Sequence, residues 1–183
     1  MEARTLSESG AAPDADAFVL WVLVWSELAA FGILLVAFLV AGIVQRQAFV
    51  AAQDHLDPLL AGMNTLVLLT SGWQAALAGR TDASRHEQRR SLVIAAFFGF
   101  LFCAIKLFEY RGEIGAAGEA TYGVFFELYF IITGFHLLHV VFGAVILLLV
   151  AWQPSPTNVT LITTLWHVID LIWVSMFPIV YLV

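Results

Sequence analysis

Several ionisable side chains lie inside long apolar stretches of this 183-residue sequence, where such groups bind a cofactor, relay protons or pair across helices. His136 and His139 are spaced i, i+3, and so are His167 and Asp170, so each pair shares one face of a helix. Glu27 lies at a similar depth in the first apolar stretch, so these side chains could form one cluster near the middle of a membrane. A second group could lie nearer to the outer face, and it consists of Lys106, Glu109 and Glu127.

Several kinds of chemistry fit the two histidine pairs. Haem is held by one or two histidines, and a metal site can combine histidine with carboxylate ligands. Chains of Glu, Asp and His also relay protons in membrane pumps. The simplest alternative is that these groups hydrogen-bond across helices and hold a bundle together, with Asp170 accepting the ring N–H of His167. Spacing alone does not separate these hypotheses.

The composition indicates a protein that lies in a lipid bilayer. Hydrophobic residues make up 61% of the chain, against roughly 45–50% in a soluble domain. A membrane-spanning helix needs about 20 mainly apolar residues, and the segments that meet this requirement are 18–44, 58–78, 91–110, 122–152 and 159–183. We therefore predict an all-α integral membrane protein, a bundle of five transmembrane helices over residues 17–183, with no nucleic-acid partner. Residues 1–16 are polar and acidic and are predicted to form a disordered tail.

Positive charge predicts the orientation. Four arginines crowd the short link between the second and third segments, and they are Arg80, Arg85, Arg89 and Arg90. Arg4 lies on the same side, whereas the opposite side holds Arg46, Lys106 and Arg111. The positive-inside rule then places the N-terminus in the cytoplasm and the C-terminus in the periplasm. The link 153–158 is short and uncharged, so the last two helices are predicted to be antiparallel neighbours.

Small residues and a lone thiol are given structural interpretations. Gly134 and Gly143 in the fourth segment permit close approach of helices, and packing within the bundle is the expected reason for them. Cys103 is the single cysteine and lies inside an apolar segment, so a disulfide framework is excluded.

Four motifs in this order resemble a known family, subunit III of the haem–copper oxidases. Residues 133–140 (TGFHLLHV) are similar to its "GxHxxHV" signature, and residues 165–173 (LWHVIDLIW) to the "WHFxDxxW" signature of its last helix. Residues 106–110 (KLFEY) resemble its Glu-Tyr motif, and Ser26-Glu27 resembles the Ser-Glu early in its five-helix core. Within the family, residues 64–71 and the ending 177–182 look most like the five-helix NorE-type proteins that are associated with nitric oxide reductase.

The resemblance implies a role without chemistry of its own. It implies a non-catalytic accessory subunit in the cell inner membrane, which supports assembly, stability and proton uptake of a large haem-bearing catalytic subunit. Haem and copper or non-haem iron would then belong to that partner, and this chain would bind membrane phospholipid but no cofactor directly. The matching polar positions would have structural or proton-buffering roles. The alternatives are a stand-alone haem- or metal-binding membrane protein that uses the histidine pairs, and a small proton channel or transporter.

Overall fold

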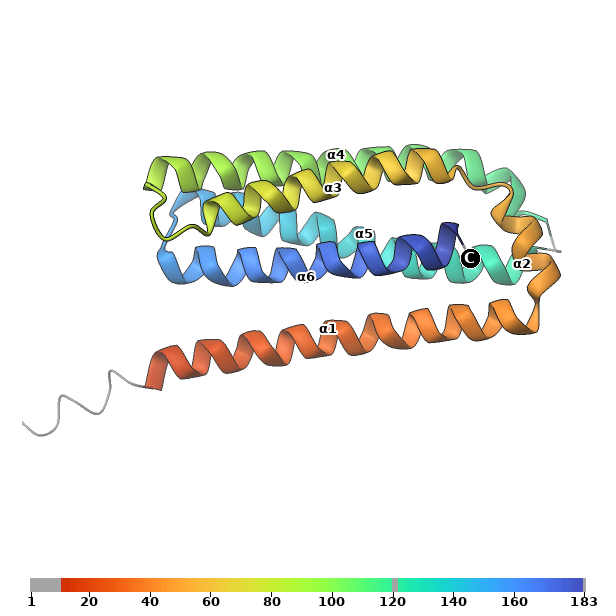
Figure 1. Ribbon diagram of the computed structural model, residues 1–183, viewed down its shortest axis with the longest axis horizontal. Coiled ribbons are helices and arrows are strands. Elements are labelled where there is room, and N and C mark those ends of the chain that lie inside the picture. Colours follow the sequence, from red (N-terminus) through yellow and green to blue (C-terminus); the bar gives the residue numbers. More distant parts are fainter. Residues whose placement is uncertain (1–10, 120–121, 183) are drawn as a thin grey trace, which may run out of the picture.

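The computed structural model describes residues 11–119 and 122–182, and these residues form helices and no strand (Figure 1). The helices are α1 (Ala11–Val44), α2 (Arg46–Gln53), α3 (Pro58–Ala78), α4 (Arg85–Ala117), α5 (Gly123–Trp152) and α6 (Pro156–Tyr181). All of them except α2 lie side by side along one axis, and α2 crosses the end of the bundle where α1 leads into α3 (Figure 1). The all-α prediction is confirmed for this part of the chain.

Four helices are long and apolar enough to cross a membrane, namely Leu20–Val44 within α1 together with α4, α5 and α6. Helix α3 has 21 residues and no charged side chain, but polar residues such as Asn64 and Gln74 lower its hydropathy, and it is not among the four. The predicted number of five spans is therefore not reached on length and composition alone.

Helix α2 is an element that the apolar segments do not predict. Its 8 residues are too few to cross a bilayer. Phe49 and Ala52 are buried while Arg46 and Gln47 are exposed, so the helix is amphipathic and packs its apolar face on α1 and α5.

Helices α1 and α4 begin several residues before the apolar segments predicted for them. The predicted disordered tail covers residues 1–16, but residues 11–16 form the first turns of α1, since alanines favour helix and Pro13 is tolerated in a first turn. Residues 1–10 lie outside the described residues. Helix α4 begins at Arg85 rather than near residue 91, because Ser84 and Glu87 form a capping box in which the Ser84 N–H donates to Glu87 Oε2 at 2.8 Å.

The link between α5 and α6 is the tight turn that was predicted. Helix α5 ends at Trp152 and α6 begins at Pro156, where Ser155 Oγ accepts the backbone N–H of Asn158 at 3.3 Å. The two helices contact each other and run in opposite directions (Figure 1), which confirms the predicted antiparallel pair.

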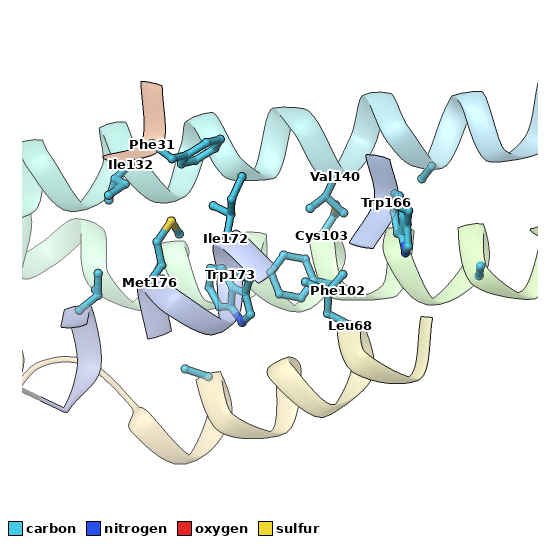
Figure 2. Close-up of a cluster of buried hydrophobic side chains, with 14 of the residues drawn as sticks. Phe31, Leu68, Phe102, Cys103, Ile132, Val140, Trp166, Ile172, Trp173 and Met176 are labelled. Carbon is cyan, nitrogen blue, oxygen red and sulfur yellow. The ribbon is translucent and has the colours of Figure 1, made fainter. Parts of the chain in front are cut away.

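A buried tryptophan joins three helices to α6. Trp166 has no exposed surface, and its Nε1–H donates to Ser71 Oγ of α3 at 3.2 Å. Ser71 in turn donates to the carbonyl of Ala95 in α4 at 2.6 Å. A Cβ added at Gly99 of α4 or at Gly143 of α5 would lie 2.8 Å from the indole ring, so both positions need glycine for the helices to close around it. Trp166 lies at one end of the aromatic core that Figure 2 shows with Phe102 and Trp173.

The prediction for glycine is therefore correct at one of the two positions in α5. Gly143 is in close contact with the indole, whereas a Cβ at Gly134 would meet no atom within 4 Å. We expect Gly143→Ala to lower the thermal unfolding temperature in detergent, because overpacking costs about 1–3 kcal/mol.

Gly134→Ala is the matched control, since it makes the same change on the same helix in open space. Equal unfolding temperatures for the two variants would contradict the close packing around Trp166.

Candidate functional site

A lysine with no exposed surface is at the centre of the most densely bonded polar cluster. Lys106 of α4 lies 3.0 Å from the Glu109 Oε2 atom on the same helix. Its ammonium group also donates to the hydroxyl of Tyr129 in α5 at 2.7 Å and to the hydroxyl of Tyr181 in α6. Three helices therefore supply partners to one buried charge, as burial of an ion in a bilayer requires.

The two tyrosines donate hydrogen bonds to two carboxylates. Tyr181 donates to Glu109 Oε1 at 2.6 Å, and Tyr129 donates to Glu113 Oε1 at 2.8 Å. Glu113 is 3% exposed and lies one helical turn beyond Glu109, so the spacing 106, 109, 113 places all three charged groups on one face of α4. We call Lys106, Glu109, Glu113, Tyr129 and Tyr181 the lysine cluster.

The sequence-based prediction for this group is correct in part. Lys106 and Glu109 lie together, but Glu127 is exposed and is not a member, because it lies on the opposite face of α5 from the buried Tyr129. Glu113 was missed, since the predicted helix ended at Tyr110 while α4 continues to Ala117. The repeat of charged residues at i, i+3 and i+7 was the signal that could have found it.

Glu27 and His139 form a second polar contact, which joins α1 to α5. Glu27 Oε2 lies 3.0 Å from His139 Nε2. The other ring nitrogen, Nδ1, lies 2.7 Å from the carbonyl oxygen of Phe135 and must donate to it, because a carbonyl only accepts. The contact between Nε2 and Glu27 is thus a polar link between α5 and α1.

His136 does not join His139, although the two are one turn apart. Its ring is 1% exposed, stacks on Trp173 at a centroid distance of 5.1 Å, and meets the edges of Phe31 and Phe102. Neither ring nitrogen has a hydrogen-bond partner among the described residues. Figure 2 shows Phe31, Phe102 and Trp173, the rings that enclose it.

His167 and Asp170 also differ from the expected pair. The distance from His167 Nδ1 to Asp170 Oδ2 is 3.8 Å, which is too long for a hydrogen bond. Asp170 is buried and its carboxylate lies against Gly72 of α3, where a Cβ would collide with Oδ2, while the His167 side chain is 47% exposed. The predicted Asp–His hydrogen bond is therefore wrong.

The expected cluster of five side chains near the middle of the membrane does not form. Glu27 and His139 meet on the side of α1, Asp170 lies against α3, and His136 is enclosed by aromatic rings between them. Within the described residues, no group of three or more His, Cys, Asp or Glu side chains could hold a metal ion. The i, i+3 spacing correctly predicts that the two residues of a pair are one turn apart on the same helix. It does not predict which neighbouring helix each of them contacts.

These apolar helices and buried charges define a multi-pass membrane protein. The family model described as cytochrome c oxidase subunit III matches residues 17–183. The chain belongs to this family.

Named relatives agree with the match. "Cytochrome c oxidase subunit 3" of Synechocystis sp. is 30% identical over 185 residues, which cover 93% of this chain and 76% of that protein. The protein of the same name from Thermostichus vulcanus is 28% identical, with 93% of this chain and 88% of its own length covered. The one from Gallus gallus is 29% identical over 129 residues, and this match covers 65% of the present chain and 48% of the Gallus gallus protein.

The lysine cluster allows a test of how far its buried charges stabilise one another. Lys106→Met leaves Glu109 and Glu113 buried without their cation, so we expect a loss of about 3–5 kcal/mol in stability. The double variant Lys106→Met/Glu109→Gln removes one of the uncompensated charges and should recover part of that loss. Thermal unfolding of the purified chain in detergent measures both.

Glu127→Gln is the control, since Glu127 is exposed on the same end of the bundle. If the single and double variants were equally destabilised, the ion pair would not be the reason for the loss.

Proposed function

We propose that this chain is a non-catalytic subunit of a respiratory haem–copper oxidoreductase in the cell inner membrane. It supports the assembly, stability and proton uptake of a large haem-bearing catalytic subunit. The family match over residues 17–183 is the observation that carries this proposal. Haem and copper or non-haem iron belong to the partner, and this chain binds none of them directly.

We further propose that α3 is the fifth membrane-spanning helix. Its 21 residues extend about 31 Å, which matches the hydrocarbon thickness of a bilayer. Three of its polar side chains have partners on other helices. Asn64 Nδ2 donates to the Phe102 carbonyl at 3.2 Å, Thr65 Oγ1 accepts the Trp173 indole N–H at 2.9 Å, and Ser71 Oγ donates to the Ala95 carbonyl at 2.6 Å. These bonds offset the low hydropathy of α3, because these three polar groups are satisfied inside the bundle.

The proposed orientation places the N-terminus in the cytoplasm and the C-terminus in the periplasm. The start of α1 lies at the same end of the bundle as the link between α3 and α4, and the C-terminus lies toward the opposite end (Figure 1). The arginine-rich stretch Arg80–Arg90 is therefore on the side of the N-terminus, which agrees with the positive-inside rule.

The polar groups receive different roles in this proposal. The lysine cluster is structural, because its charges bond to each other and fix α4, α5 and α6. Glu27 and His139 are assigned the proton-buffering role, because a carboxylate and an imidazole lie 3.0 Å apart and their side chains remain 23% and 21% exposed. Helix α1 exposes a long apolar face that includes Trp21, Trp25 and Ile33, and this face is open to lipid or to the catalytic subunit.

Two catalytic partners fit, and they differ in the acceptor that is reduced. The resemblance of residues 64–71 and 177–182 to NorE-type proteins favours a nitric oxide reductase. The named relatives are cytochrome c oxidase subunits, so an oxygen-reducing cytochrome c or quinol oxidase is the second candidate.

Affinity purification of the tagged chain from its native membrane in mild detergent, followed by mass spectrometry, tests the proposal. We expect one large haem-binding subunit in near-stoichiometric amount, and its identity decides between nitric oxide and oxygen. A tagged, unrelated multi-pass protein of the same membrane is the control for non-specific recovery. Recovery of the chain alone, under conditions that keep other respiratory complexes intact, would contradict the proposed role.

A further inference from the structure

A histidine near the middle of α6 is exposed on the outside of the bundle. His167 lies close to the midpoint of this helix, which has 26 residues and is about 39 Å long. Its side chain is 47% exposed. An imidazole that faced acyl chains at this depth would lose its hydration and gain no hydrogen bond, and for this reason ionisable side chains in membrane helices face protein or water. The exposure of His167 therefore indicates that a polar group from outside this chain covers it.

The neighbouring carboxylate also lacks a hydrogen-bond donor. Asp170 is 6% exposed, and its Oδ1 atom has no hydrogen-bond partner among the described residues. The Oδ2 atom lies against Gly72 of α3 and is 3.8 Å from His167 Nδ1, which is too long for a hydrogen bond. Buried polar atoms in folded proteins nearly always have a partner. The histidine and the carboxylate are therefore incomplete within the described part of the chain.

Hydroxyl groups on the same side of α6 differ, because the helix itself satisfies them. Thr164 Oγ1, one turn before the histidine, donates to the carbonyl of Thr160 at 2.8 Å. Ser175 Oγ donates to the carbonyl of Leu171 at 2.9 Å. These hydroxyls need no partner from outside, so the unmet hydrogen-bonding capacity of this side lies with the histidine and the carboxylate.

Apolar side chains surround the histidine. Leu171 and Val174 follow His167 at i+4 and i+7 on α6, and they are 59% and 42% exposed. We call His167, Leu171 and Val174 the α6 outer face. An acyl chain could cover the two apolar residues but offers no hydrogen bond to the imidazole, and a lipid headgroup is about 15 Å away at the edge of the hydrocarbon core. A helix of another protein can cover both kinds of residue.

The exposed surfaces of the other long helices are apolar in their central parts. Ile33 of α1, Phe97 of α4 and Leu138 of α5 are 69%, 62% and 65% exposed. Side chains of this kind are stable against lipid without any partner. The α6 outer face is therefore better suited to a protein contact than these surfaces are.

We propose that the α6 outer face docks against a membrane-spanning helix of the catalytic subunit, and that this helix presents a hydrogen-bond donor to His167. The carboxylate of Asp170 lies nearest to Nδ1, so its negative charge favours a proton on that nitrogen and leaves Nε2 free to accept. Hydrogen bonds between polar side chains hold membrane helices together. The inference rests on the proposed function, because it takes the catalytic subunit as the occupant.

Photo-cross-linking in the native membrane identifies what covers this face. A benzophenone amino acid is placed at position 171, one turn after His167, and in a matched variant at position 138, which is equally central and exposed on α5. We expect position 171 to form a covalent adduct with the haem-bearing subunit, recognised by mass spectrometry of the linked peptide. Position 138 should give lipid adducts.

Two substitutions test the hydrogen bond itself. His167→Leu should lower the recovery of the haem-bearing subunit about threefold to tenfold, which is the size of effect that hydrogen bonds between membrane helices have. The unfolding temperature of the isolated chain in detergent should stay the same or rise, since an exposed imidazole is replaced by an apolar side chain. Thr164→Val is the matched control, because its hydroxyl bonds to its own helix, and recovery should not change.

Each other outcome identifies a particular error. Lipid adducts at both positions, with the haem-bearing subunit still recovered, would overturn the docking face and leave the proposed function intact. An adduct between position 171 and a second copy of this chain would overturn the assignment of the occupant. A lower unfolding temperature of the isolated His167→Leu chain would show that the histidine serves the bundle, which also overturns the inference. Failure of the unmodified chain to recover any haem-bearing subunit would contradict the proposed function and this inference with it.

Discussion

The lysine at position 106 imposes the strictest physical constraint on this bundle. An ammonium group at membrane depth with no exposed surface is stable only when neighbours replace its lost hydration. Those neighbours come from α4, α5 and α6, and each must be in register to within hydrogen-bond distance of one nitrogen. Polar contacts to one nitrogen therefore fix α4, α5 and α6 relative to one another, in addition to the aromatic core around Phe102, Trp166 and Trp173.

The two ends of α4 show opposite uses of charge. At one end Lys106, Glu109 and Glu113 bond to each other and to tyrosines, and they leave little for an outside ligand. At the other end Arg85 and Arg89 have no acidic partner in the described part of the chain and face a surface pocket. Charges that bond to each other suit the interior of a bundle. Charges without a partner suit the headgroup layer, because that layer is in contact with water and phosphate.

The sequence was sufficient for the helical class and for the antiparallel pair of α5 and α6, because apolar segments of this length have few alternatives in a membrane. It also placed Lys106 and Glu109 in one group by their depth, and they do meet, since neighbours at i, i+3 share a face of a helix. It missed Glu113 because α4 continues beyond the predicted end of the helix at Tyr110. It misplaced Glu127 because the face of α5 that packs in the bundle could not be predicted. His136 shows the limit most clearly, since its spacing to His139 is that of a ligand pair while its surroundings are aromatic rings. Long-range packing decides which helix a residue contacts, and the spacing of residues along one helix does not predict it.

The central claim is that the buried polar groups of this chain are structural or proton-holding, and that any redox centre belongs to a partner. The absorption spectrum and metal content of the chain, separated from co-purifying subunits and still folded, test this claim most directly. The account predicts no Soret band and no metal in stoichiometric amount. A haem band or a bound metal that stays with the chain and disappears in His136→Ala or His167→Ala would contradict it, and would make the histidine pairs a cofactor site.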